Sequence, residues 1–140
     1  MREILYKAKR ITDGEWVYGS YVYIFCEDKN GIVVGVEVGK HWIVEPNGKM
    51  TWIDEDTICQ FTGFTDMNGQ KIWENDILCG NLDDMYPDDK TYTQVIWHKN
   101  GWYTKENCGI DYNMMDEFDE HFFTVVGNVF DNADLLKEVV

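Results

Sequence analysis

The sequence predicts a mainly β protein, a strand-rich α+β chain in which a β-hairpin lobe precedes a compact barrel. Four Asn-Gly dipeptides, at residues 30–31, 47–48, 68–69 and 100–101, each lie between segments rich in Val, Ile, Trp, Tyr and Thr. Asn-Gly favours the type I′ turn of a β-hairpin, because that turn needs a positive φ at both central residues. Several flanking segments also alternate in polarity, as strands with one solvated face do.

The strands follow from these patterns in order along the chain. Gly19 and Gly35 interrupt otherwise good strands and indicate bulges or a close approach of another backbone. Trp97 and Trp102 flank Asn100-Gly101 and are expected to be cross-strand partners. The predicted strands are Trp16–Phe25, Ile32–Val38, His41–Glu45, Lys49–Ile53, Thr57–Phe61, Asp76–Cys79, Thr91–His98, Trp102–Lys105 and Phe122–Phe130.

The remaining segments read as loops or short helices. Asn81–Lys90 has the Pro, Asp and Asn of a solvated loop. Apolar residues three and four apart predict a short helix within Asp111–Glu120, and Asp131 or Asn132 is expected to cap a final turn. With only two prolines and no linker, residues 1–140 form a single unit, in which a change of pattern near 62–68 suggests lobes 1–61 and 62–140.

The charge balance excludes broad classes of partner. Twelve Lys and Arg face 26 Asp and Glu, a formal net charge of −14, which disfavours general nucleic-acid binding and adsorption to an anionic membrane. The charge is uneven, because the first ten residues carry a net +3 and the other 130 carry −17.

Compartment and cofactors follow from what the pattern lacks. No apolar run approaches the ~20 residues that span a bilayer, and the start shows no signal peptide, so a cytoplasmic protein is expected. The four cysteines, Cys26, Cys59, Cys79 and Cys108, are then expected to be reduced and mostly buried. Their wide spacing predicts no zinc site, and we expect no metal and no cofactor.

Two stretches resemble the YopX family. Residues 59–78, Cys-Gln-Phe-Thr-Gly-Phe-Thr-Asp-Met-Asn-Gly-Gln-Lys-Ile-Trp-Glu-Asn-Asp-Ile-Leu, are similar to its central signature, and residues 125–136 resemble its closing segment. The opening Arg2-Glu3-Ile4, with Gly14-Glu15-Trp16-Val17 and Gly19, looks like one variant of its N-terminus. Asn75 replaces the usual Gly before Asp76, and Ala133-Asp134 replaces the usual Pro-Glu. Asn also tolerates the left-handed conformation, so the turn need not change.

The resemblance implies a small phage or prophage protein, mainly β, with a barrel-like C-terminal part. We therefore expect residues 62–140 to form a small SH3-like β-barrel with short helices. The resemblance implies no activity, because the family offers no established catalytic role to carry over.

The residues themselves offer weak catalytic candidates. Glu74 and Asp76 stand two apart, so on a strand they share one face and suggest a carboxylate pair for acid–base work or a divalent metal ion. A divalent-metal-dependent hydrolase is therefore kept as a weaker alternative, although turn chemistry explains the same residues better. Without a placed base beside any cysteine, no nucleophile is supported, and a non-enzymatic protein is expected.

The leading functional hypothesis rests on the acidic residues. A stretch without Lys or Arg runs from Asp111 to Asp134 and includes Asp116, Glu117, Asp119 and Glu120. Such a strip either solvates one face or imitates the phosphates of nucleic acid and occupies a basic groove on a host or phage protein. We favour an accessory protein that acts by protein–protein contact in the host bacterial cytoplasm, and we expect it to form homo-oligomers through exposed edge strands.

A second hypothesis belongs to another class. Small β-barrels often bind nucleic acid, and Lys7, Lys9 and Arg10 supply a local basic patch. Aromatic stacking platforms also serve single strands, but within a positive groove that the overall charge argues against.

Overall fold

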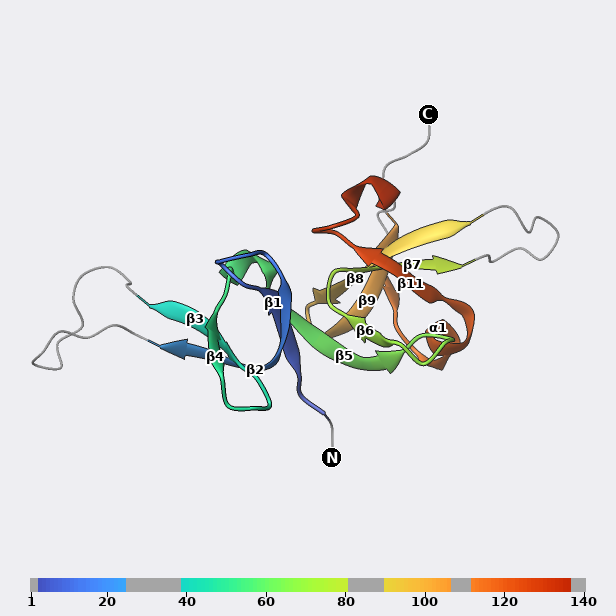
Figure 1. Ribbon diagram of the computed structural model, residues 1–140. Helices are drawn as coiled ribbons and strands as arrows, with labels where there is room; N and C mark the ends of the chain where they lie inside the picture. Colours follow the sequence, from blue (N-terminus) through green and yellow to red (C-terminus); the bar gives the residue numbers. More distant parts are fainter. Residues whose placement is uncertain (1–2, 25–38, 81–89, 107–111, 137–140) are drawn as a thin grey trace, which may run out of the picture. The chain divides into compact units, whose positions relative to one another are not determined.

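The structure is a computed structural model and describes residues 3–24, 39–80, 90–106 and 112–136 (Figure 1). The chain divides into two compact units, residues 1–60 and residues 61–140. The described residues form mostly β-strands and only short helices, which confirms a mainly β protein. All of the described strand pairs are antiparallel. The predicted strand Ile32–Val38, the loop at 81–89, and Asn30-Gly31 with Gly35 lie outside the described residues.

Unit 1–60 is an antiparallel sheet with one buried face. Its strands alternate between buried and exposed positions, as the period of two requires, so that Ala8, Val17 and Ile43 point to the same side and form a core with Ile53. The sheet order is β4-β3-β2-β1, and the start of β5 pairs with β1. The elements are β1 (Tyr6–Lys9), β2 (Trp16–Ile24), β3 (Lys40–Val44), β4 (Met50–Trp52), the 3₁₀ helix η1 (Glu55–Thr57) and β5 (Cys59–Thr65).

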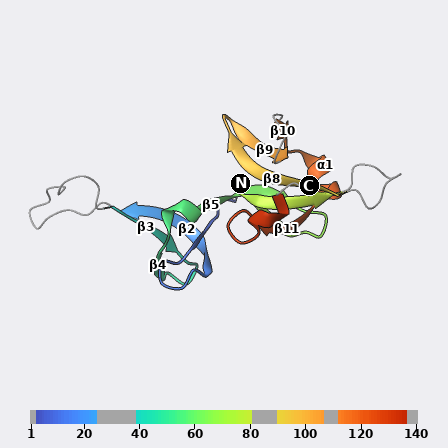
Figure 2. The ribbon, with the colours of Figure 1, turned by 90° about the horizontal axis from the view of Figure 1, so that it is seen from above.

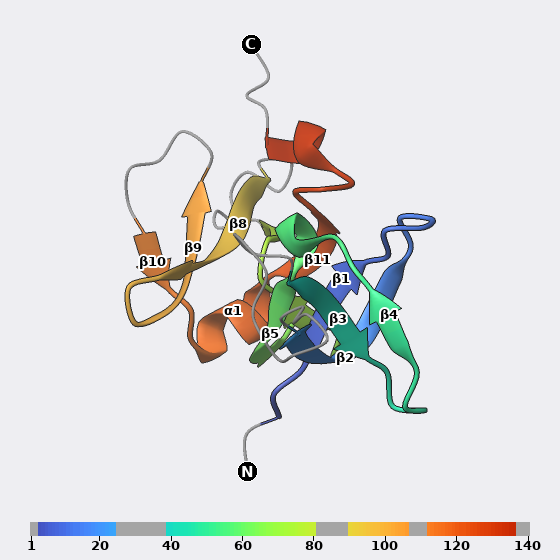
Figure 3. The ribbon, with the colours of Figure 1, turned by 90° about the vertical axis from the view of Figure 1, so that its left-hand side faces the viewer.

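Unit 61–140 contains a five-stranded antiparallel sheet and the hairpin formed by the end of β5 with β6. Figure 3 shows the neighbouring strands β8, β9 and β10, and Figure 2 shows the β8–β9 hairpin from above. A core of Ile72, Leu78, Val95, Met115 and Phe123 joins the two parts. The elements are β6 (Lys71–Trp73), β7 (Asp76–Gly80), β8 (Thr91–His98), β9 (Gly101–Glu106), β10 (Tyr112–Met114), α1 (Glu117–Phe122), β11 (Thr124–Asn128) and the 3₁₀ helix η2 (Ala133–Leu136).

The closed SH3-like barrel expected for residues 62–140 is not confirmed. The sheet order is β10-β9-β8-β7-β11, and within the described residues β10 and β11 remain two separate edges. The chain provides a reason for this open order. After three residues of β10 it turns into α1, which is flanked by the core side chains Met115 and Phe123. A helix thus follows at the point where a further strand would be needed to continue the sheet.

The Asn-Gly dipeptides mark hairpins, but by a different turn than predicted. At Asn47-Gly48 the amide of Gly48 donates to the carbonyl of Glu45 (2.8 Å), and only the glycine has a positive φ, of 85°. Asn68-Gly69 repeats this, with Gly69 donating to Asp66 (2.9 Å) at φ 80°. These are type I-like turns with Asn at the third position and a left-handed glycine at the fourth.

The third dipeptide lies one residue away from its turn. His98 pairs with Gly101, so the two loop residues are Lys99 and Asn100, and Lys99 takes the positive φ of 56°. The predicted partnership of Trp97 and Trp102 is confirmed, because they pair across the hairpin with ring centroids 5.0 Å apart. The type I′ prediction is wrong for all three described dipeptides.

The helical prediction for Asp111–Glu120 is wrong in its first half. Residues 112–114 form β10, and helix α1 starts only at Glu117. Three short strands, β1, β6 and β10, were not predicted from the sequence. The predicted close backbone approach at Gly19 is confirmed, since a Cβ there would fall on the carbonyl oxygen of Val44.

Candidate functional site

Asp66 organises the central signature. It is 4% exposed, and its Oδ1 accepts hydrogen bonds from the amides of Asn68 and Gln70, both at 2.9 Å. Its Oδ2 accepts from the amide of Val125 at 3.0 Å, so one carboxylate ties the β5–β6 turn to β11. The next residue reinforces this tie, because the amide of Met67 donates to the carbonyl of Phe123. Asp66 is therefore a structural residue in the part of the chain that is described.

The carboxylates considered for acid–base or metal chemistry lie at a second turn. Asp76 is 2% exposed, and its Oδ2 accepts from the amide of Trp73 at 2.8 Å, while Glu74 is partly buried. Asn75 between them has φ 69°, the left-handed conformation in which the family usually has Gly. Its Oδ1 accepts from Gln94 Nε2 at 3.1 Å. Among the described residues, no three His, Cys, Asp or Glu side chains converge so that they could hold a metal ion.

The predicted acidic residues are divided by the fold. Asp116 is exposed between β10 and α1, whereas Glu120 is partly buried. The Oε1 of Glu120 accepts from the amide of Thr65 at 3.2 Å, so this carboxylate links α1 to β5. Glu117 and Asp119 lie in α1, and their side chains are outside the described part. Neutralising Glu120 therefore requires a substitution that keeps an acceptor oxygen.

The N-terminal cations do not share one environment. Lys7 is 6% exposed, and its Nζ lies 4.5 Å from the centre of the Trp16 ring; Lys9 Nζ lies 5.4 Å from the same ring. Arg10 belongs to the following turn, where its Nε is 3.3 Å from Asp13 Oδ1. The second hypothesis assumed one continuous basic patch of Lys7, Lys9 and Arg10. These contacts instead place Arg10 in a different environment from the two lysines.

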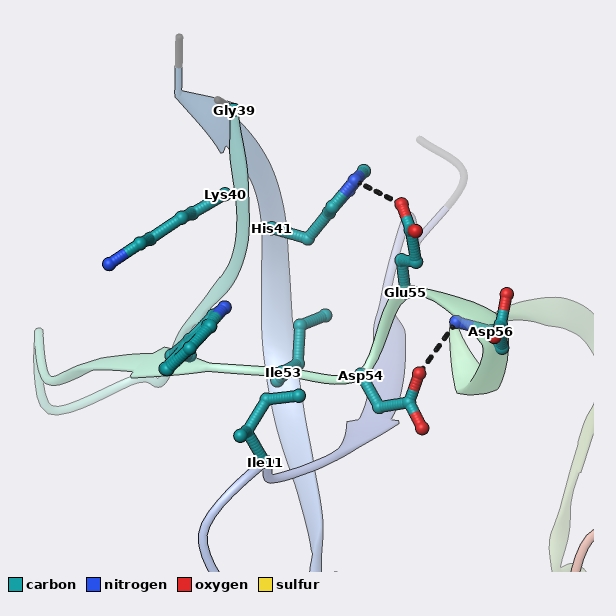
Figure 4. A pocket seen from close by; sticks show the side chains of 9 residues that line it. Ile11, Gly39, Lys40, His41, Ile53, Asp54, Glu55 and Asp56 are labelled. Carbon is teal, nitrogen blue, oxygen red and sulfur yellow. Dashed lines mark hydrogen bonds and ion pairs between the residues drawn. The ribbon is translucent and has the colours of Figure 1, made fainter. Parts of the chain in front are cut away.

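Unit 1–60 also contains a polar chain that sequence reasoning missed. Tyr21 on β2 and His41 on β3 meet through Tyr21 Oη and His41 Nδ1, 2.5 Å apart. His41 Nε2 lies 2.6 Å from Glu55 Oε2, and Figure 4 shows this second contact. A carboxylate only accepts, so Nε2 carries the proton that faces Glu55, and in the neutral tautomer Nδ1 accepts from the phenol. The register of β2 and β3, which places Tyr23 opposite His41, brings these residues together.

His41 and Glu55 of this polar chain border a pocket of about 360 Å³. Ile11 and Ile53 supply apolar lining, and Lys40 and Trp52 supply another part of the wall (Figure 4). Burial raises the pKa of Tyr21, and the nearby Tyr23, Glu55 and Tyr6 raise it further. Tyr21 therefore keeps its phenolic proton at neutral pH and is not an activated nucleophile. Glu55 is 63% exposed, so solvent screens its pairing with His41.

None of the helices in the described part of the chain has the length and apolar character needed to cross a bilayer. Both described cysteines, Cys59 and Cys79, are free thiols, and Cys59 is buried. Cys26 and Cys108 lie outside the described residues.

Comparison with known proteins supports the family resemblance. The sequence profile of the family described as YopX protein matches residues 6–137. Among solved structures, the crystal structure of protein EF1440 from Enterococcus faecalis is similar, with a TM-score of 0.57 and 18% identity, over 98% of this chain and 100% of that chain. At this identity the likeness concerns the fold alone. A search of curated proteins finds no match.

Proposed function

Because the chain belongs to the YopX family, we propose that it is a phage or prophage accessory protein that acts through protein–protein contacts in the cytoplasm of the bacterial host. In this proposal it is not an enzyme. An acidic surface of unit 61–140 takes the place of nucleic acid in the basic groove of a host or phage protein.

The uneven charge of the two units carries this proposal. Residues 61–140 contain five Lys and Arg against sixteen Asp and Glu, a net charge of −11. Residues 1–60 contain seven against ten, a net charge of −3. A surface that carries one sign of charge attracts partners of the opposite sign and speeds their association. A partner selected by this unit is therefore a basic protein.

Asp116, Glu117 and Asp119 are the residues we propose for the contact. Asp116 is exposed next to the short edge strand β10, whose three residues are all exposed. Glu120 is left out of the tested set, because its carboxylate bonds to Thr65. The same exposed edge supports the proposal that the protein self-associates, which sedimentation at several concentrations tests directly.

The test is a tagged pull-down from nuclease-treated host lysate at low and moderate salt, read by mass spectrometry. The test variant carries Asp116→Asn, Glu117→Gln and Asp119→Asn. The control variant carries Glu15→Gln, Asp56→Asn and Glu106→Gln, which remove three charges from exposed positions elsewhere. Both variants have the same net charge, so they differ only in where the charge is lost.

We expect the wild type and the control to recover the same basic protein, which is released at higher salt, and the test variant to lose it. Equal recovery by all three proteins would contradict acidic mimicry at this segment. Equal loss in both variants would show that net charge alone drives the capture.

A further inference from the structure

Unit 1–60 has a second sheet face, on the side opposite its core. Strand residues alternate between the two faces, and the pairs Lys9–Trp16, Lys7–Tyr18 and Trp42–Trp52 place their members on the same side. The lysine–tryptophan face consists of Lys7, Lys9, Trp16, Lys40, Trp42 and Trp52.

Several apolar side chains on this side of the sheet are exposed, although Lys7 itself is buried. Tyr18 is 46% exposed, Met50 45%, Trp52 43% and Ile24 42%, and all four share its side of the sheet. Contiguous exposed apolar surface of this kind marks a binding surface more often than it marks ordinary solvated structure.

Its charge is opposite to that of the molecule. In the described strands β1 to β4, every charged residue on this side is a lysine, whereas the chain as a whole carries −14. Among the described residues that adjoin these strands, carboxylates lie at the borders, with Glu15 before β2, Glu45 after β3, and Asp54 after β4. The face therefore fits an anionic ligand. The carboxylates at its borders repel such a ligand, so charge alone does not give strong binding.

The lysines stand beside the aromatic rings. Lys40 Nζ lies 4.6 Å from the centre of the Trp52 ring, and Lys7 and Lys9 lie over Trp16. Positive charge thus lies beside the rings, and Trp52, which is 43% exposed, still presents ring surface to solvent. A ligand that combines planar aromatic groups with regularly spaced negative charges matches this arrangement, and single-stranded nucleic acid has that chemistry.

The spacing suits several nucleotides. Three adjacent strands place one residue each side by side, namely Trp52, Trp42 and Val22. Tyr18 lies four residues before Val22 on β2. At roughly 3.3 Å per residue, about 13 Å separates Tyr18 from Val22. A duplex keeps its bases stacked inside, so it cannot use the rings in this way.

We propose that the lysine–tryptophan face binds single-stranded nucleic acid, with bases on the exposed aromatic rings and phosphates at Lys9 and Lys40, while the buried Lys7 only adds positive charge beneath the face. This site is separate from the acidic contact of unit 61–140, so it goes beyond the function proposed above. General, charge-driven binding is not implied, since only two accessible lysines take part.

The experiment is fluorescence anisotropy with the full chain and labelled 20-nucleotide probes of mixed sequence, as single-stranded DNA, single-stranded RNA and duplex DNA. The test variant is Tyr18→Thr with Trp52→Thr. The matched control is Tyr112→Thr with Trp97→Thr, an exposed Tyr and Trp of unit 61–140, 39% and 53% exposed. Circular dichroism confirms that each variant is folded.

We expect the single strands to bind better than the duplex, and the test variant to bind at least about tenfold more weakly than the control. The logarithm of the binding constant should fall with the logarithm of salt concentration with a slope of about −1.4, because each of the two accessible lysines, Lys9 and Lys40, releases roughly 0.7 counterion. Lys40→Gln should make this slope shallower by about 0.7. Asp116→Asn with Glu117→Gln and Asp119→Asn should leave single-strand binding at least as strong.

Three results would overturn the proposal. The first is no binding of any probe at low salt by folded wild type. The second is equal weakening in the test and control variants. The third is self-association that Tyr18→Thr with Trp52→Thr abolishes while no oligonucleotide binds, which would assign the face to a second copy of this chain.

Discussion

Asp66 shows why a short signature can be distinctive without being catalytic. Its two oxygens accept three backbone hydrogen bonds, from Asn68, Gln70 and Val125, in a nearly fully buried position. Asp76 and Asn75 act similarly at the next turn, where one caps a backbone amide and the other takes a left-handed φ. The spacing of Asp, Asn and Gly in this stretch is thus set by the hydrogen bonds of two adjacent turns.

Replacing Asp66 by Asn should destabilise the protein by about 1–3 kcal/mol, because the amide group that replaces one oxygen cannot accept a hydrogen bond. Urea unfolding of wild type and variant at neutral pH measures this loss. Asn68→Ala is the control, because only its backbone amide bonds to Asp66. A loss below about 0.5 kcal/mol for Asp66→Asn would contradict the structural role.

Tyr21 gives a prediction about alkaline pH. Burial is the main cause that raises the pKa of Tyr21 in the folded state above the ordinary tyrosine value of about 10. Between the two pKa values the unfolded chain has lost a proton that the folded protein keeps, so stability falls as the pH rises above about 10. Tyr21→Phe should remove this contribution and, at neutral pH, cost about 0.5–1.5 kcal/mol for the lost bond to His41.

The measurement is urea unfolding of wild type and Tyr21→Phe at several pH values between 8 and 11. Other tyrosines and lysines titrate in both proteins, so only the difference between the two curves is informative. A difference that stays constant above pH 10 would contradict the raised pKa of Tyr21.

Single residues differ in how well the sequence predicts them. The tight space at Gly19 follows from residue type, whereas the left-handed conformation at Asn75 follows from the family resemblance, in which Gly is usual there; both are found in the structure. The contacts that join Tyr21, His41 and Glu55 cannot be predicted from residue type, because they depend on the register of β2 with β3 and on the position of η1. No local pattern encodes that register.

At the scale of elements, hairpins are easier to predict than the turns that close them. Asn-Gly correctly indicates where the chain reverses at 47–48, 68–69 and 100–101, but not which residues adopt positive φ. Loop length decides the turn type, and cross-strand pairing decides loop length. The strands β1, β6 and β10 are only three or four residues long, too short for a period of two to stand out.

The β8–β9 turn provides a matched pair of substitutions. Lys99→Gly should stabilise the protein by up to about 1 kcal/mol, because Lys99 holds a left-handed φ of 56° that costs a residue with a Cβ. Asn100→Gly should be neutral or destabilising, since Asn100 has no positive φ and glycine only adds freedom to the unfolded chain. Thermal unfolding of both variants tests this, and the reverse order would contradict the observed turn.

At the scale of the molecule, the two units present chemically opposite surfaces. Unit 61–140 carries a net −11, whereas the lysine–tryptophan face of unit 1–60 carries only positive charge. The net charge of each unit could be calculated from the sequence, but it describes only the average charge of that unit and not the charge of one face. The lysine–tryptophan face could not be predicted from the sequence, because it forms only when Lys7 and Lys9 on β1 align with residues of β2, β3 and β4.

The prediction of a closed barrel for residues 62–140 is not confirmed, for a related reason. Counting strands predicts a sheet, but closure depends on whether the first and last strands pair, and here β10 and β11 stay apart among the described residues. The acidic segment was likewise identified in sequence, while the fold commits Glu120 to Thr65 and leaves Asp116 exposed.

The most direct test of acidic mimicry is a displacement titration. The basic protein recovered by pull-down is first bound to fluorescent duplex DNA, and the full chain is then added at low salt. The account predicts that the DNA is released, and that Asp116→Asn with Glu117→Gln and Asp119→Asn releases much less than Glu15→Gln with Asp56→Asn and Glu106→Gln. A stable complex containing the partner, the DNA and this protein would contradict it.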